Sequence, residues 1–206
     1  MKALILVDIQ NDFLPGGALA VPHGNGVIPA ANRLAAVFPL VVATQDWHPA
    51  DHGSFAATHA GKQVFDSIEM NGLPQTLWPV HCVQNTHGAE LPADLDRERI
   101  TKVFFKGTDP TIDSYSGFFD NGHRKATGLG EFLKTNDVTA VFVCGLATDY
   151  CVKATALDAV QLGFKTYLIE DASRGVNLQS DDVANAIKQM QAVGVCILTS
   201  ADVMGC

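Results

Sequence analysis

The sequence has no long apolar run and no cluster of basic residues. No apolar segment approaches the ~20 residues of a membrane helix, and the first run, residues 3–7, stops at Asp8, too short for a signal peptide. Against 22 Asp and Glu residues stand only 14 Lys and Arg residues, for a net charge of −8. Because nucleic acids and anionic membranes bind basic surfaces, we expect neither as a partner.

Motifs for disulfide pairing are also missing. The chain has an odd number of cysteines without CxxC spacing: Cys82, Cys144, Cys151, Cys196 and Cys206. We therefore expect no disulfide framework and a cytoplasmic location. The 206 residues contain no linker, repeat or low-complexity tract, and 47% are hydrophobic. This composition predicts a single domain over residues 1–206.

What is present is an alternation of strand-like and helix-like segments. Short apolar runs predict strands at 3–7, 40–44, 102–105, 138–144, 165–169 and 195–198. Helical spacing predicts helices at 27–38, 128–134 and 149–162, and a further helix that Ser180 caps and Gly194 ends. The fold class is therefore α/β: a three-layer α/β/α domain around a six-stranded, mostly parallel sheet.

Polar residues follow four of these strands. Asp8 ends the first, Asp46 follows the second, Lys106 ends the third and Cys151 follows the fourth. Ligands of parallel α/β sheets bind at the carboxyl ends of the strands. These side chains therefore converge on one edge and predict an active site there.

Cys151 is the candidate nucleophile, in the first turn of a helix that directly follows a strand. Thr148 is the expected N-cap, so the positive end of the helix would face Cys151 and lower the pKa of its thiol. Asp8 could act as its base, and Lys106 could hold the charge of Asp8. The alternatives are a small buried cysteine, a turn-capping aspartate and a solvated lysine.

A second group of side chains suggests a metal. Asp46 and His48 alternate, so they project to one side of an extended segment, and His52 and His81 lie in nearby loops. One carboxylate with two or three imidazoles suits a divalent metal such as zinc, with iron or manganese as alternatives. The competing interpretation is a polar loop with hydrogen-bonded histidines. The remaining histidines are expected at the surface: His23, His59, His87 and His123.

Three aromatic residues stand next to these polar groups in the sequence: Phe13, Trp78 and Tyr115. Aromatic side chains usually fill cores. If these three line a pocket, they suit a flat, mostly apolar ligand.

Taken together, the motifs resemble those of the bacterial nicotinamidase (pyrazinamidase) family of isochorismatase-like cysteine hydrolases. The resemblance runs in order along nearly the whole chain and includes residues 113–122. Its segments are Asp8-x-Gln10-x-Asp12-Phe13, Asp46-Trp47-His48, Trp78-Pro79-x-His81-Cys82, Phe105-Lys106-Gly107 and Gly145-Leu146-Ala147-Thr148-Asp149-Tyr150-Cys151.

The resemblance implies a role for each matched residue. Cys151 would be the nucleophile, Asp8 the general base and acid, and Lys106 the third member of the triad. The resemblance also implies metal ligands at Asp46, His48 and His81, with His52 where some members of the family have a fourth. Phe13 and Trp78 would sandwich a pyridine ring, and Tyr115 and Leu146 would also contact substrate. A cis peptide would precede Ala147, whose amide would form an oxyanion hole with that of Cys151.

The implied reaction is hydrolysis of nicotinamide to nicotinate and ammonia through a cysteine thioester, as part of NAD salvage. The metal would position the pyridine ring, pyrazinamide would also be accepted, and the protein could form a homo-oligomer. Two other activities compete with this one: hydrolysis of another small amide, and a metalloamidase in which Cys151 is structural. Hydrolysis of isochorismate is disfavoured, because isochorismatases lack a cysteine at the position that matches Cys151. A non-catalytic binding protein of this fold is disfavoured too, because it would need a broken triad and the triad residues are present here.

Overall fold

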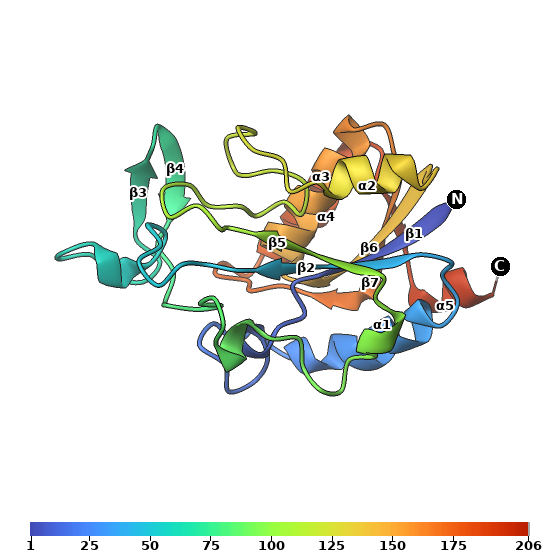
Figure 1. Cartoon of the computed structure of the whole chain (residues 1–206), viewed down its shortest axis with the longest axis horizontal. Helices are drawn as coiled ribbons and strands as arrows, with labels where there is room; N and C mark the ends of the chain where they lie inside the picture. The colour runs from blue at the N-terminus through green and yellow to red at the C-terminus, as the bar shows by residue number, and fades with distance from the viewer. Residues whose placement is uncertain (206) are drawn as a thin grey trace.

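A six-stranded parallel sheet forms the centre of the molecule, which we describe over residues 1–205 from a computed structural model (Figure 1). The strand order is β5-β2-β1-β6-β7-β8, and each neighbouring pair is parallel. Its strands are β1 (Lys2–Val7), β2 (Val41–Asp46), β5 (Lys102–Lys106), β6 (Ala140–Leu146), β7 (Lys165–Arg174) and β8 (Cys196–Leu198). The predicted α/β fold with six strands is confirmed.

Helices cover both faces of the sheet, because the central strands are apolar on both sides. Along β1, Leu4 and Leu6 join one core cluster, whereas Ile5 and Val7 join the other. The first cluster packs against α1 (Ile28–Ala35), and α5 (Ser200–Met204) contacts α1. The second packs against α2 (Leu129–Thr135), α3 (Lys153–Gln161) and α4 (Asp182–Ala192). Figure 1 shows these two layers below and above the sheet.

Two predicted helix caps are wrong. One turn of π-helix, Thr148–Val152, precedes α3, so Thr148 lies inside the helical segment and makes no capping bond. At α4 the N-cap is Asp181 rather than Ser180, and its side chain makes no capping bond either. The nearby Asn177 Oδ1 instead accepts a hydrogen bond from the Val183 amide, at 3.1 Å.

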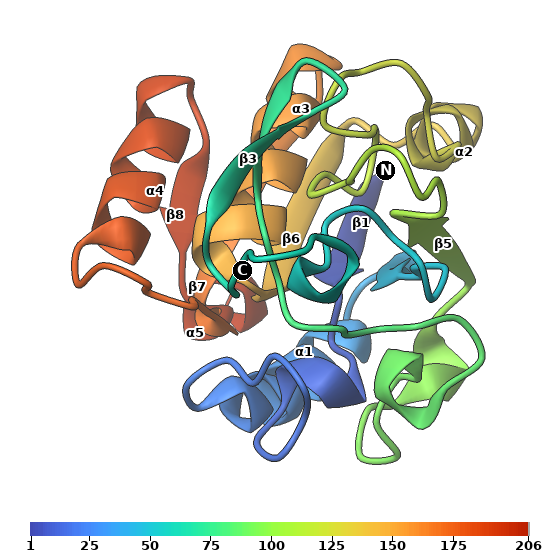
Figure 2. The ribbon, with the colours of Figure 1, turned by 90° about the vertical axis from the view of Figure 1, so that its left-hand side faces the viewer.

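A small hairpin, β3 (Ser67–Met70) and β4 (Leu73–Thr76), lies in the stretch that the sequence pattern left without structure. Its turn residues, Asn71 and Gly72, both have positive φ, at 53° and 78°. Asn-Gly is the preferred pair for such a two-residue turn, so this signal was present in the sequence. Figure 2 looks onto the carboxyl ends of the strands, with β3 in front of them.

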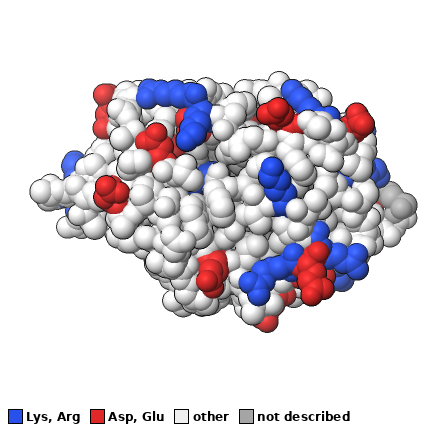
Figure 3. Space-filling view, viewed as in Figure 1, with Lys and Arg blue, Asp and Glu red and all other residues white. Residues whose placement is uncertain are grey.

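The distribution of charged side chains on the surface agrees with the low content of Lys and Arg. On the face in Figure 3, Lys and Arg side chains are scattered among Asp and Glu. No helix within residues 1–205 is long and apolar enough to cross a membrane.

Candidate active site

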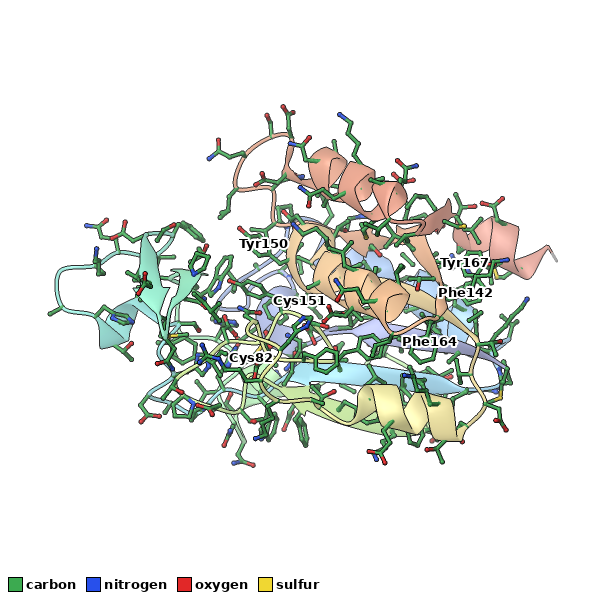
Figure 4. The ribbon with its side chains drawn as sticks, turned by 90° about the horizontal axis from the view of Figure 1, so that it is seen from above. Cys82, Phe142, Tyr150, Cys151, Phe164 and Tyr167 are labelled. Carbon is green, nitrogen blue, oxygen red and sulfur yellow. The ribbon has the colours of Figure 1, made fainter. Side chains whose placement is uncertain are left out.

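The site lies at the centre of the sheet, at the point where the strand order changes direction. Strands β1 and β6 are neighbours, and the next strand along the chain from each lies on opposite sides of this pair. Such a switch point leaves a crevice at the carboxyl ends of the two strands. Asp8 follows β1. Cys151, labelled in Figure 4, lies just beyond β6.

Lys106 joins Asp8 to Cys151. Its Nζ lies 2.9 Å from Asp8 Oδ2 and 3.4 Å from Cys151 Sγ, and it donates to Ser114 O at 2.8 Å. All three predicted triad side chains are buried. Folding therefore brings together a thiol, a carboxylate and an ammonium from three distant segments, as the sequence analysis expected.

The electrostatics of the thiol differ from the prediction. Burial raises the pKa of Cys151 well above its usual range, and the nearby charge of Lys106 does not offset this. Burial also raises the pKa of Asp8 to about 6, although Lys106 opposes the rise. The helix terminus was expected to lower the pKa of Cys151, but the terminal turn is buried against two carboxylates. Cys151 therefore rests as a thiol and needs a base.

Thr44 holds the carboxylate of Asp8 in place. Its Oγ1 donates to Asp8 Oδ1 at 2.5 Å, and its backbone oxygen accepts from the Asp8 amide at 3.3 Å. Thr44 is fully buried on β2, beside β1. The sequence reasoning missed it, because a threonine inside a strand carries no signal of its own.

Asp46, His48 and His81 form a group suited to a metal ion. Asp46 Oδ2 lies 3.7 Å from His48 Nε2 and 3.8 Å from His81 Nε2, and all three residues are buried. The His48 Nδ1 lies 2.8 Å from Gly107 O, and the His81 Nδ1 lies 2.8 Å from Pro79 O. A carbonyl only accepts, so each Nδ1 carries a hydrogen, and each Nε2 points toward Asp46. This donor set fits a divalent metal.

The same carboxylate connects the metal group to the triad. Asp46 Oδ1 accepts from Lys106 Nζ, while its Oδ2 faces the two imidazoles. Burial pushes the pKa of Asp46 upward, but the charges of Lys106 and His48 outweigh it and hold the pKa well below its usual range. Burial, followed by the charge of His48, lowers the pKa of His81 to about 4. An ionised carboxylate and a neutral imidazole are the forms that bind metal, as the pKa shifts of Asp46 and His81 favour. Burial lowers the pKa of His48, but the charge of Asp46 outweighs it and raises that pKa, so His48 would lose its Nε2 proton when a metal binds.

His52 lies beside His48 but belongs to a different group. Its Nδ1 lies 2.7 Å from Ser54 Oγ, and its ring centroid lies 4.3 Å from that of His48. Together with His48 and Asp113 it forms a second possible ligand group, whereas the first contains Asp46, His48 and His81. Its Nε2 is buried and has no hydrogen-bond partner within residues 1–205. Ligation of a metal by His52 therefore stays a prediction.

An apolar cavity adjoins both groups. It is lined by Phe13, Trp78 and Tyr115, together with Cys151 and Asp46. We call it the ring cavity. The three predicted aromatic residues are thus brought to one place.

Leu146, the other predicted substrate contact, is fully buried in a core cluster and is not among the residues that line the ring cavity. Ala147 does line it, and the Leu146–Ala147 peptide bond is cis. The cis bond therefore stands where the resemblance implies it. Of the four remaining histidines, His23, His87 and His123 are exposed, and the half-buried His59 contacts Gly53 O through its Nε2 at 2.7 Å.

Two polar residues of the first motif support this arrangement. Gln10 accepts from the Asp46 amide through Oε1 and donates to Asp46 O through Nε2, both at 2.8 Å. Asp12 Oδ2 accepts from the Cys82 amide at 2.7 Å and so fixes the residue next to His81. Although the sequence motif contains both residues, only the folded chain shows what they hold.

Gly107 supports the metal group by leaving room for His48. A Cβ added at Gly107 would lie 2.3 Å from the His48 ring, so we expect Gly107→Ala to displace that ring. Disturbing the groups that hold a ligand in place typically costs 10–100-fold in metal affinity, and we expect a loss of about tenfold or more. Titration of the metal-free protein with zinc would measure it.

The matched control is Gly61→Ala. Both glycines have positive φ, +61° at Gly107 and +76° at Gly61, but nothing lies within 4 Å of a Cβ added at Gly61. The two variants therefore share the backbone penalty and differ in the contact with His48. Equal zinc affinity in both would contradict the placement of His48 in the metal group.

Comparison with known proteins agrees with this site. The family model described as the isochorismatase domain matches residues 2–202. The nicotinamidase of Escherichia coli (strain K12) is 51% identical over 205 residues, covering 98% of this chain and 96% of the relative.

Solved structures give the same result. One titled Acinetobacter baumanii nicotinamidase pyrazinamidease superposes with a TM-score of 0.95 at 48% identity, covering 98% of this chain and 97% of the other. The pyrazinamidase of Pyrococcus horikoshii, solved in complex with zinc, has a TM-score of 0.79 at 40% identity, covering 96% and 98%. The resemblance inferred from the motifs is confirmed, and the chain belongs to the isochorismatase domain family, in the group formed by the nicotinamidases.

Proposed function

We propose that the protein hydrolyses nicotinamide to nicotinate and ammonia through a thioester on Cys151. The observation that carries this proposal is that Lys106 contacts both Asp8 and Cys151 at the wall of an aromatic cavity that also holds Asp46 and His81. A nucleophile, a proton carrier and ring-binding groups thus surround one small space. The identity with nicotinamidases supports nicotinamide as the ligand.

In the first half of the reaction, Asp8 takes the proton of the Cys151 thiol. The pKa of Asp8, raised to about 6, leaves a carboxylate at neutral pH that can still carry a proton for part of the cycle. The sulfur then attacks the amide carbon, and a bond forms between them as the carbonyl oxygen becomes negative. When the carbonyl re-forms, the carbon–nitrogen bond breaks and Asp8 returns the proton to the leaving ammonia.

In the second half, water replaces the sulfur. Asp8 takes a proton from the water as its oxygen attacks the thioester carbon, and the carbon–sulfur bond then breaks. The proton returns from Asp8 to the Cys151 sulfur, which restores the thiol, and the acid product loses its own proton to solvent and leaves as nicotinate. We place the amides of Ala147 and Cys151 at the oxyanion, where one donor is typically worth ~3 kcal/mol.

Lys106 holds the charges of the site through both halves. Its ammonium lies between the carboxylates of Asp8 and Asp46, whose attraction raises its pKa well above the usual range although burial opposes this. Lys106 therefore stays charged and offsets the repulsion between the two carboxylates. It also limits how far burial can raise the pKa of Asp8.

A metal would be held by Asp46, His48 and His81, and we propose zinc, with iron or manganese as alternatives. When bound, it supplies a Lewis-acidic position for the ring nitrogen. The residues of this chain do the remaining positioning. Phe13 and Trp78 line the ring cavity, where they can contact the faces of a flat ring.

The proposal extends to the wider role of the protein. We infer that residues 1–206 act as one catalytic domain, that pyrazinamide is also a substrate, and that the reaction serves NAD salvage in the cytoplasm. The thiol nucleophile favours a reducing compartment. The structure describes one chain, and assembly into a homo-oligomer stays a prediction.

Ammonia release tests the proposed function. We expect the purified protein to release ammonia from nicotinamide and to act far more slowly on benzamide, which lacks the ring nitrogen but keeps the amide. Chelation should lower the nicotinamide rate and leave the benzamide rate nearly unchanged, and added zinc should restore the difference. If neither nicotinamide nor pyrazinamide releases ammonia, the activity belongs to another small amide.

A further inference from the structure

A second cavity lies on the other side of Tyr150 from the ring cavity. It is lined by residues of α3 and α4, among them Lys153, Asp182, Asn185 and Gln189. We call it the α3–α4 cavity. Its volume is about 370 Å³, against about 30 Å³ for the ring cavity. Among residues 1–205, Tyr115 and Tyr150 alone line both, so these two side chains form the partition between them.

The two tyrosines of this partition are held differently. Tyr115 is fixed by its hydroxyl, which accepts from Trp78 Nε1 at 3.2 Å and from Gln75 Nε2 at 3.3 Å. Tyr150 is half-buried, and its hydroxyl has no hydrogen-bond partner within residues 1–205. Its ring is held by edge contacts, with centroids 4.9 Å from Trp78 and 5.6 Å from Tyr115. Tyr150 is therefore the part of the wall that a substitution can remove without breaking a polar network.

Tyr150 also stands next to the surface that would face a ring. The planes of Trp78 and Tyr150 meet at 83°, so the Tyr150 ring stands nearly perpendicular to the Trp78 ring, and both line the ring cavity. Figure 4 shows Tyr150 beside Cys151 on this side of the molecule. A substituent on a pyridine ring that points past Trp78 would meet Tyr150.

The α3–α4 cavity is lined by both polar and apolar residues. Lys153 is half-buried on its wall, with no carboxylate within 4 Å in the described chain. The two oxygens of Asp149 are already taken by the amides of Val176 and Asn177, at 2.9 and 2.7 Å. The lining thus combines the Lys153 ammonium and the side-chain amides of Asn185 and Gln189 with the carboxylate of Asp182. These groups suit a small polar group, and an anionic one where it reaches Lys153.

We propose that Tyr150 sets the substrate range of the enzyme by closing the ring cavity against the α3–α4 cavity. Unsubstituted pyridine carboxamides fit the closed cavity. Pyridine carboxamides with a polar group on a ring carbon facing Tyr150 are excluded, and removal of the Tyr150 ring admits them. This inference rests on the proposed function.

The test compares nicotinamide with nicotinamides that carry a carboxylate or a hydroxymethyl group at ring carbon 5 or 6. For Tyr150→Ala we expect kcat/KM for at least one substituted amide, divided by that for nicotinamide, to rise about tenfold or more. Tyr150→Phe keeps the ring and should keep the wild-type ratio. Tyr150→Leu, which fills more of the gap, should give an intermediate ratio and replaces Tyr150→Ala if that variant does not fold.

A second substitution checks where the substituent goes. Adding Lys153→Met to Tyr150→Ala should remove the gain for the carboxylate-bearing amide and preserve that for the hydroxymethyl amide. The proposal is overturned if the wild-type protein hydrolyses the substituted amides with the same kcat/KM as nicotinamide. It is also overturned if Tyr150→Ala lowers kcat/KM equally for all substrates. Failure of the proposed function is a different result, because wild type would then release no ammonia from nicotinamide.

Discussion

Cys151→Ala is expected to abolish ammonia release from nicotinamide, with kcat lowered by about 10⁴-fold or more. Without the sulfur, the site loses the nucleophile that would form the acyl intermediate. The substitution removes one buried atom and leaves Asp46, His48 and His81 in place, so metal content should not change. Ammonia assays paired with metal analysis of the same sample would measure both quantities.

The matched control for this prediction is Cys144→Ala. Cys144 is also buried, but it lies in the opposite core cluster from Cys151. Cys144→Ala makes the same chemical change as Cys151→Ala, but we expect it to keep the wild-type turnover. Substantial turnover by Cys151→Ala would instead favour a metalloamidase with a structural cysteine. Iodoacetamide separates the two mechanisms as well, because only a thiol enzyme would lose activity with its metal still bound.

Asp8→Asn is expected to lower kcat by about 10³-fold or more, because an amide can neither take the thiol proton nor return one to ammonia. The change is nearly isosteric, and Lys106 keeps its contact with Asp46. The high pKa of Cys151 makes the effect large, since a buried thiol loses its proton only to a base in contact with it. Single-turnover measurement of thioester formation would show the loss in the first step.

Thr44→Val is a milder change at the same carboxylate, and its loss of kcat can be compared with that of Asp8→Asn. It removes the hydroxyl that donates to Asp8 Oδ1 and leaves the carboxylate itself intact. We expect kcat to fall by about tenfold, well short of the loss in Asp8→Asn, because Thr44 acts through Asp8. If Thr44→Val were as damaging as Asp8→Asn, or if Asp8→Asn kept most of its activity, Asp8 would not be the proton carrier.

Much of the site could be predicted because polar residues interrupt apolar strands. Asp8 and Lys106 end such strands, and the rule for parallel sheets places strand ends at one edge. The resemblance then assigned roles that the residue pattern alone left open. For Asp46, His48 and His81 the structure shows the shared geometry, while ligation itself awaits the zinc titration.

Other features could not be obtained in this way, because they depend on what packs around a residue. The sequence predicts a low pKa for Cys151 from the helix terminus, but burial beside Asp8 has the larger effect and raises it. Thr44 and Tyr150 have no local signal, since their partners lie far away along the chain or in another layer. The partition formed by Tyr150 exists only because α3 and α4 leave space behind it.

By itself, the sequence determined the α/β architecture, the family and the candidate catalytic residues, because apolar periodicity and the order of motifs depend only on the order of residues in the chain. The tertiary structure alone decided that the pKa of Cys151 is raised, that His52 shares a group with His48 and Asp113, and that a wall separates the two cavities. These properties depend on distances and burial among segments remote in sequence. Coulombic and desolvation energies are functions of such distances, and residue order does not specify them.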